Sequence, residues 1–153
     1  MQITQYHEQQ HLLLNELEID SLVMEIISFK KIICDEIIIH FVTNDAISEL
    51  HQEFFNDPSP TDCITFPIDG QHSLEHYKIL GEIFISPEMA TDYSPEDPYL
   101  EVTLYIVHSI LHLLGYDDID HLDIKKMRDA ESELMNHLKK RAIALSGPNV
   151  VAK

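Results

Sequence analysis

Apolar residues recur along this chain at helical spacing in some segments and in short β-branched runs in others. The stretch SLVMEIISF, from Ser21, has apolar side chains three and four positions apart, which predicts a helix that faces a core. The run EIIIHFV, over 36–42, is rich in β-branched residues and has the length of a strand. Asn44 then offers an N-cap for the segment DAISELHQEFF. The pattern therefore predicts a helix, a strand and a second helix in this order.

A loop and two further strands are expected next. The stretch NDPSPTDC, over 56–63, concentrates Pro, Asp and Ser, and its two prolines exclude a central strand. The runs CITFPI and LGEIFIS, the second over 80–86, have the composition of strands. A polar loop separates these two runs, so they either pair as a hairpin or lie further apart.

The segment over 100–114 is expected to be a helix that is buried on nearly all sides, because apolar residues cover most of its circumference. Either Ser94 or Asp97 caps its start, since each directly precedes a proline suited to the first helical position. Gly115 follows the segment and suits the left-handed conformation found just past many helix ends.

A last amphipathic helix is expected over 121–145. At 153 residues, the chain is long enough to bury one core, so 1–153 is expected to form a single domain. The apolar positions of the last helix include Leu122, Met127, Leu134 and Leu138.

One polar sector interrupts the apolar surface of the helix expected over 100–114. Because a buried polar group without a partner costs about 1–3 kcal/mol, this strip must find partners. Its histidines either bond carbonyl groups in the core or bind a metal ion. On a helical wheel of about 100° per residue, the sector holds Glu101, Tyr105, His108, Ser109 and His112.

Histidine spacing alone does not decide between these alternatives. With 10 His in 153 residues, about 0.6 pairs would lie four residues apart by chance, and three do. Two of these pairs, His7/His11 and His72/His76, lie in polar surroundings near a terminus and in a glycine-bearing loop, so both are expected to be solvated. The third pair lies in the stretch HSILHLLGYDD and needs support from its context.

The turn after the third pair supplies that support. Gly115 reverses the chain, so Asp118 can return its carboxylate toward His108 and His112. Two imidazoles and one carboxylate leave a fourth tetrahedral position open for water, as in catalytic zinc sites. Two alternatives therefore stay open at this point: a metal site at these three residues, with metal-bound water as the nucleophile, or two core histidines bonded to carbonyl groups.

The order HxxxHxxGxxD is also the layout of the metzincin zinc proteases. Their glutamate after the first histidine, which takes a proton from the zinc-bound water, is replaced here by Ser109. A metal-bound hydroxide can attack a phosphodiester without that base. The chemistry therefore favours phosphoryl hydrolysis over peptide hydrolysis.

Composition limits which cellular compartment and which partners are expected. The formal net charge is −17, from 27 acidic and 10 basic residues, which opposes non-specific attraction to nucleic acid. Cys34 and Cys63 have no zinc-like spacing and are expected to be buried free thiols in a reducing compartment. The N-terminus lacks export-signal features and no segment reaches the roughly 20 apolar residues of a membrane span, so a cytoplasmic protein is expected.

Three blocks of this sequence resemble the YbeY endoribonuclease family. HSILHLLGYDD matches the family motif HGxLHLxGYDH except at Ser109 and Asp118. PTDCITFP, over 60–67, is similar to the family block PTDVLSFP, and LGEIFIS is similar to LGDIxIS. The blocks occur in family order, and the resemblance covers roughly residues 36–135 of the chain.

The resemblance implies an α+β fold, with a small mostly parallel or mixed β-sheet flanked by helices and a metzincin-like metal-binding helix. It implies one Zn²⁺ held by His108, His112 and, where the family has its third histidine, Asp118; His121 is the alternative third ligand. It further implies single-strand-specific endonucleolytic cleavage of RNA in maturation of the 3′ end of 16S rRNA. The implied partners are rRNA, the small ribosomal subunit and ribosome-assembly proteins.

The family usually has a Tyr-Arg pair before the PTD block, and its arginine is thought to meet the RNA phosphate. Phe54 and Phe55 stand at these positions, and a phenyl ring cannot make a bidentate phosphate contact. Lys78 is the first candidate to compensate. Two alternatives therefore remain: a ribosome-assembly binding module with a structural metal and little or no nuclease activity, and a hydrolase of another substrate such as a peptide, which Ser109 disfavours.

Several residues in or near the motifs have more than one possible role. Asp117 and Ser109 are candidates to orient the metal site, although Asp117 equally suits capping of the turn after the glycine. Thr61 and Asp62 are expected to fix the loop geometry through bonds to the backbone. Finally, the strand that would flank the cleft carries Glu82 and Ser86, which line it or have only surface or strand-end roles.

Overall fold

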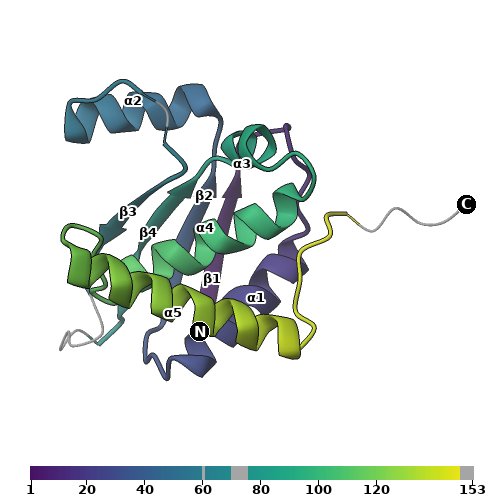
Figure 1. Ribbon diagram of the computed structural model, residues 1–153, viewed down its shortest axis with the longest axis vertical. Helices are drawn as coiled ribbons and strands as arrows, with labels where there is room; N and C mark the ends of the chain where they lie inside the picture. Colours follow the sequence, from purple (N-terminus) through teal and green to yellow (C-terminus); the bar gives the residue numbers. More distant parts are fainter. Residues whose placement is uncertain (60, 70–75, 149–153) are drawn as a thin grey trace, which may run out of the picture.

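The computed structural model describes residues 1–59, 61–69 and 76–148, and these form an α+β fold (Figure 1). As expected, a small mixed sheet is flanked by helices. In chain order, the elements of the described residues are β1 (Gln2–His7), α1 (Glu16–Phe29), β2 (Glu36–Phe41), α2 (Asn44–Phe55), β3 (Cys63–Pro67), β4 (Ile79–Ile85), α3 (Pro87–Tyr93), α4 (Pro98–Leu113) and α5 (His121–Lys140).

The four strands are ordered β1-β2-β4-β3. β1, β2 and β4 are parallel neighbours, and β3 pairs antiparallel with β4 at the edge. The β3–β4 register joins Cys63 to Ile85 and Pro67 to Gly81, so of the two arrangements open from sequence the hairpin is the one adopted. A proline at the end of β3 is compatible with this edge position.

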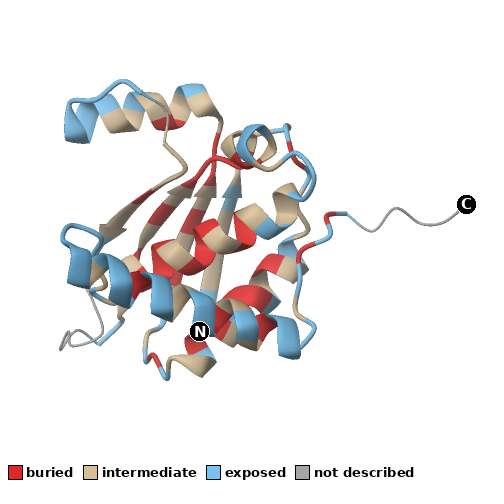
Figure 2. Ribbon diagram, in the orientation of Figure 1, coloured by how far each residue is buried: buried red, intermediate tan, exposed pale blue. Residues whose placement is uncertain are grey.

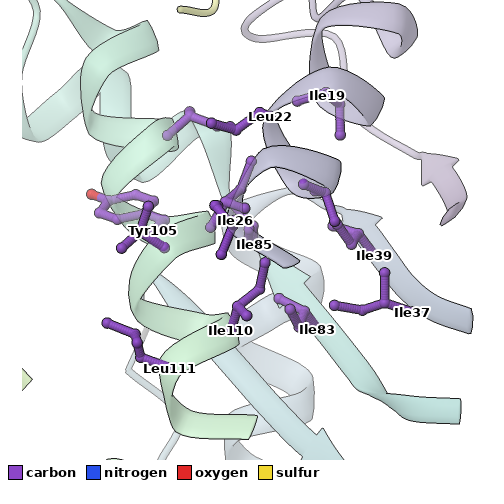
Figure 3. Close-up of a cluster of buried hydrophobic side chains, with 14 of the residues drawn as sticks. Ile19, Leu22, Ile26, Ile37, Ile39, Ile83, Ile85, Tyr105, Ile110 and Leu111 are labelled. Atoms are coloured by element: carbon purple, nitrogen blue, oxygen red, sulfur yellow. The ribbon is translucent and has the colours of Figure 1, made fainter. Parts of the chain in front are cut away.

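One face of the sheet carries the main core. Alternate residues of β2, Ile37, Ile39 and Phe41, are fully buried, as the period of two in a strand requires. Figure 3 shows Ile26 of α1 and Ile110 of α4 meeting the isoleucines of the central strands in this core. α5 packs outside α4 and exposes its outer face to solvent (Figure 2).

The ends of α4 are specified locally. Asp97 is its N-cap and accepts a hydrogen bond from the Leu100 amide at 3.1 Å, and Pro98 takes the first helical position. Of the two predicted starts, the Asp97 cap is therefore correct. Past the other end, Gly115 has φ +99°, which confirms the predicted reversal of the chain.

Gly81 brings the end of α4 close to the sheet. A Cβ atom at Gly81 would lie 2.5 Å from Leu113 Cδ2 and 2.9 Å from the Phe66 carbonyl oxygen. Only a residue without a side chain allows this approach. Gly81, the glycine of the LGEIFIS block, therefore allows α4 to pack closely on β4. The contact is at Leu113, directly after the second histidine of the candidate metal site.

The structure corrects several expectations about individual residues. Thr43, and not Asn44, caps α2, because Thr43 Oγ1 accepts from the Ala46 amide while the Asn44 side chain accepts from Ser86 Oγ at 2.6 Å. α5 ends at Lys140 and not at 145. The other corrections concern burial.

Leu122 and Leu100 are exposed, at 61% and 55%, although both were expected to face the core. Leu122 lies about 140° around α5 from Met127, so it points away from the stripe of Met127, Leu134 and Leu138 that packs on α4. Leu100 lies in the first turn of α4, and burial on nearly all sides begins only at Val102.

The cysteines are free thiols, as expected, but they are half-buried and not fully buried. Desolvation raises the pKa of both Cys34 and Cys63, and the neighbouring Asp62 carboxylate raises the pKa of Cys63 further. Both groups are therefore uncharged thiols near neutral pH, without the thiolate character that reactive cysteines need.

Candidate metal centre

His108 and His112 meet Asp118 at the C-terminal half of α4. The Nε2 atoms of the two histidines are 3.0 Å apart, and Asp118 Oδ2 lies 3.8 Å from the first and 3.6 Å from the second. Within the described residues, this is the group of three His, Cys, Asp or Glu side chains whose donor atoms converge closely enough to hold a metal ion. The turn at Gly115 brings the carboxylate back as predicted.

The size of this triangle fits zinc. Tetrahedral ligands at zinc distances of about 2.0–2.2 Å are themselves about 3.3–3.6 Å apart. The three separations bracket this range, and a point about 2.0 Å from all three atoms exists between them. The Asp118 side chain is half-exposed and, like His108, lines a cavity, which leaves room beside the three donor atoms for a fourth ligand.

Glu131 of α5 holds the first histidine. Its Oε2 atom lies 2.5 Å from His108 Nδ1, and the Glu131 side chain is only 12% exposed. A carboxylate at Nδ1 keeps the proton on that nitrogen and leaves the Nε2 lone pair for a metal, the arrangement found around many metal-binding histidines. The Glu131 hydrogen bond also raises the pKa of His108, against the lowering effect of burial.

The candidate metal centre opens into a cavity of about 710 Å³ between α3, α4, α5 and the loop before β3. Its lining combines four carboxylates and several apolar or aromatic side chains with one arginine, Arg128. Burial and the nearby Glu101 carboxylate raise the pKa of Tyr105, so its hydroxyl stays protonated and can donate a hydrogen bond. The residues along the cavity are Thr61, Asp62, Met89, Tyr93, Glu101, Leu104, Tyr105, His108, Asp118, Ile124, Met127, Arg128 and Glu131.

Neither candidate for an orienting group, Ser109 or Asp117, lines the cavity, nor does His121, the alternative third ligand. Ser109 is fully buried, and its Oγ has no hydrogen-bond partner among the described residues. Asp117 is exposed and lines a separate hollow with Tyr116 and Lys126. His121 is exposed in the first turn of α5 and does not join the convergent group.

Thr61 and Asp62 line the cavity; Asp62 bonds the backbone as expected, whereas the Thr61 hydroxyl donates to the Asp62 carboxylate and not to the backbone. Asp62 Oδ1 accepts a hydrogen bond from the Cys63 amide at 2.8 Å and lies 3.4 Å from Thr61 Oγ1. Ser86 is buried as the N-cap of α3, where it donates to Asn44, and Glu82 contacts His40 at 3.0 Å. Neither Ser86 nor Glu82 lines the cavity.

Phe54 and Phe55, which stand where the family has its Tyr-Arg pair, lie outside the cavity. Phe55 is 55% exposed at the end of α2, where its ring contacts His51, and neither Phe54 nor Phe55 lines the cavity. Lys78 also lies outside the lining, next to β4.

The two other histidine pairs do not form comparable sites within the described residues. His7 is only 22% exposed, with its ring stacked 4.9 Å from Phe41, so its expected solvation is wrong. His11 and His76 are exposed as expected, and His72 lies outside the described residues.

Glu131 was missed from sequence although the signal was present. The apolar stripe of α5 runs through Met127, Leu134 and Leu138, and position 131 continues the same spacing of three and four residues. An acidic residue in a buried stripe needs a partner. His108 is that partner.

Within the described residues, no helix is both long and apolar enough to cross a membrane.

Comparison with known proteins agrees with the three sequence blocks. The sequence model of the endoribonuclease YbeY family matches residues 3–139. A protein named endoribonuclease YbeY from Protochlamydia amoebophila (strain UWE25) is 46% identical over 137 residues, which cover 88% of this chain and 91% of that protein. A protein of the same name from Chlamydia pneumoniae is 38% identical over 146 residues, covering 92% of both chains.

A solved structure has the same overall fold. The solution structure of a Thermotoga maritima protein matches with a TM-score of 0.53, covering 99% of this chain and all of that one. The two sequences are 21% identical, so this likeness concerns the fold alone.

Proposed function

Because this chain belongs to the YbeY endoribonuclease family, we propose that it is a zinc-dependent, single-strand-specific endoribonuclease that acts in maturation of the 3′ end of 16S rRNA in the cytoplasm. The observation that carries the proposal is the convergence of His108, His112 and Asp118 at the edge of an open cavity. The small ribosomal subunit and ribosome-assembly proteins are the proposed partners.

The donor set suits the proposed metal. A zinc ion held by two imidazoles and one carboxylate would supply Lewis acidity and a hydroxide nucleophile near neutral pH. Glu131 fixes the His108 ring and its Nδ1 proton, so that Nε2 faces the other two donor atoms. Asp118 adds a negative charge where the family has a neutral imidazole, which lowers the net positive charge that the centre presents to a phosphate.

The cavity supports preference for single strands. Tyr93 lies at its edge with 76% of its surface exposed, so the ring is free to stack on a base. Bases in a duplex are already stacked and paired, whereas unpaired bases can turn toward an aromatic ring. A cavity of about 710 Å³ has room for part of a single strand.

A ribosome-assembly module with a structural metal and little nuclease activity is the second candidate. Two observations favour it: Phe55 replaces the family arginine, and the cavity carries the carboxylates Asp62, Glu101, Asp118 and Glu131 in a chain of net charge −17. The two candidates share the metal and differ in catalysis.

Cleavage of a labelled single-stranded RNA by wild type and His112→Ala separates the candidates. Each protein is assayed as purified, after removal of metal by a chelator, and after addition of one equivalent of Zn²⁺. The endoribonuclease predicts cleavage that is lost with the chelator, restored by zinc and absent in His112→Ala. The binding module predicts bound zinc with equal, negligible cleavage in wild type and His112→Ala, and a wild type that binds no metal would contradict both.

A further inference from the structure

We propose that Arg128 of α5 binds a phosphate group of the RNA in the cavity, an inference that rests on the endoribonuclease function proposed above. Among the described residues along the cavity, Arg128 is the single lysine or arginine. Its position in the chain is outside every sequence block that points to the family.

Arg128 is available for a ligand. Its side chain is exposed, and it makes no hydrogen bond or ion pair with any described residue. Two other cations of α5 and its end are engaged: Lys125 Nζ lies 2.9 Å from Asp129, and Arg141 Nε lies 3.5 Å from Glu25. Four carboxylates line the same cavity, and none of them pairs with the Arg128 guanidinium. Its N–H donors are therefore free to bind a ligand.

Arg128 lies on the face of α5 that lines the cavity. Positions three and four apart share a helix face, and both Ile124 and Glu131 line the cavity together with Arg128. Glu131 contacts the metal-binding His108. The guanidinium is therefore carried one helical turn from the residue that holds the metal centre.

Charge explains why such a group is needed. Four carboxylates line the cavity, and each repels a phosphodiester that approaches the metal. Arginine presents a planar set of donors that match two phosphate oxygens at once and stays charged at any physiological pH. Phe55 and Lys78 do not line the cavity, so neither supplies this contact.

Variants of Arg128 test the proposal against a matched change on the same helix. Arg128→Ala, Arg128→Lys and Lys125→Ala are compared with wild type, all loaded with Zn²⁺. Lys125→Ala removes the same charge from α5, but Lys125 pairs with Asp129 outside the cavity lining. The readouts are kcat/KM on a single-stranded RNA at several salt concentrations, the affinity for that RNA, the zinc Kd and the thermal midpoint.

Arg128→Ala is expected to lower kcat/KM at least about tenfold, because it removes a charge-assisted bidentate contact. The slope of log kcat/KM against log salt should become shallower by about 0.7, the effect of one lost phosphate contact on a single strand. Arg128→Lys should recover part of the rate, since it keeps the charge but not the planar fork. Lys125→Ala should stay within about twofold of wild type, and all four proteins should keep the same zinc Kd.

Equal rates for Arg128→Ala and Lys125→Ala, in a wild type that cleaves, would overturn the role of Arg128 alone. A zinc Kd that rises in Arg128→Ala would also overturn it, because Arg128 would then act on the metal centre. If zinc-loaded wild type binds RNA without cleaving it, weaker binding by Arg128→Ala than by Lys125→Ala still supports the contact. If wild type neither binds nor cleaves RNA, the proposed function fails and the assignment fails with it.

Discussion

Glu131 Oε2 and His108 Nδ1 lie 2.5 Å apart, and this contact joins α5 to the face of α4 that carries the two histidines of the candidate metal site. Through this contact, α5 contributes a side chain to the candidate site in addition to covering the core. The carboxylate selects the imidazole tautomer with a free Nε2.

Replacing Glu131 should weaken metal binding without removing a ligand. Glu131→Gln is expected to raise the zinc Kd about 10- to 100-fold, since the carboxylate next to a metal-binding histidine contributes that much in comparable sites. The control is Glu133→Gln, the same change at an exposed position of α5. Competition with a chromophoric chelator measures both, and equal Kd values would show that Glu131 does not support the metal site.

Asp118 is predicted to be the third ligand in preference to His121. Asp118→Ala should raise the zinc Kd by at least about 100-fold, more than the loss of a supporting carboxylate, whereas His121→Ala should leave it unchanged. His121 is exposed and outside the convergent group. A large loss in His121→Ala with full affinity in Asp118→Ala would reverse the assignment.

Gly81→Ala is predicted to destabilise the fold by about 1–3 kcal/mol, because the new methyl group would overpack the contact of β4 with Leu113 and the Phe66 carbonyl. Urea unfolding measures this change. Gly115→Ala is the comparison: a Cβ there meets no atom within 4 Å, but φ is +99°, so only backbone strain of about 1–2 kcal/mol is expected. A neutral Gly81→Ala would show that α4 does not sit this close to the sheet.

The contact of Glu18 with the segment after α5 should make stability depend on pH. Burial tends to raise the pKa of Glu18, but hydrogen bonds from the Ser146 hydroxyl and the Ser146 and Gly147 amides lower it below its usual value near 4.5. A carboxyl with a lowered folded-state pKa stabilises the fold above its unfolded pKa, and the effect disappears as the pH falls through the folded value.

Glu18→Gln is therefore expected to unfold at a lower temperature than wild type at pH 7, with the difference shrinking below pH 4.5. Thermal unfolding across this pH range checks the prediction, with Glu16→Gln, at an exposed position in the same turn of α1, as the control. A difference between wild type and Glu18→Gln that persists at pH 2 would contradict it.

Much of the fold followed from the sequence because its central elements are strongly patterned. The β-branched run of β2 and the apolar α4 were predicted with nearly correct bounds. β1 was missed, since QITQYH forms an edge strand with no fully buried residue and therefore has little hydrophobic pattern. α3 was missed because seven residues hold too few positions to show a helical period.

The candidate site was predicted where its residues are close in sequence. His108, His112 and Asp118 span one helix end and one turn, so spacing and Gly115 were enough to bring them together. Glu131 and Arg128 join the site through packing of α5 on α4, which depends on the tertiary fold. Local spacing does not contain that information.

The most direct test of the account is the rate of single-stranded RNA cleavage as zinc is added to the metal-free protein. The account predicts a rate that rises to a plateau at one equivalent of Zn²⁺ per chain and stays at background in His112→Ala. A rate that is independent of zinc, or that is the same in His112→Ala and wild type, would contradict the claim that this centre drives cleavage.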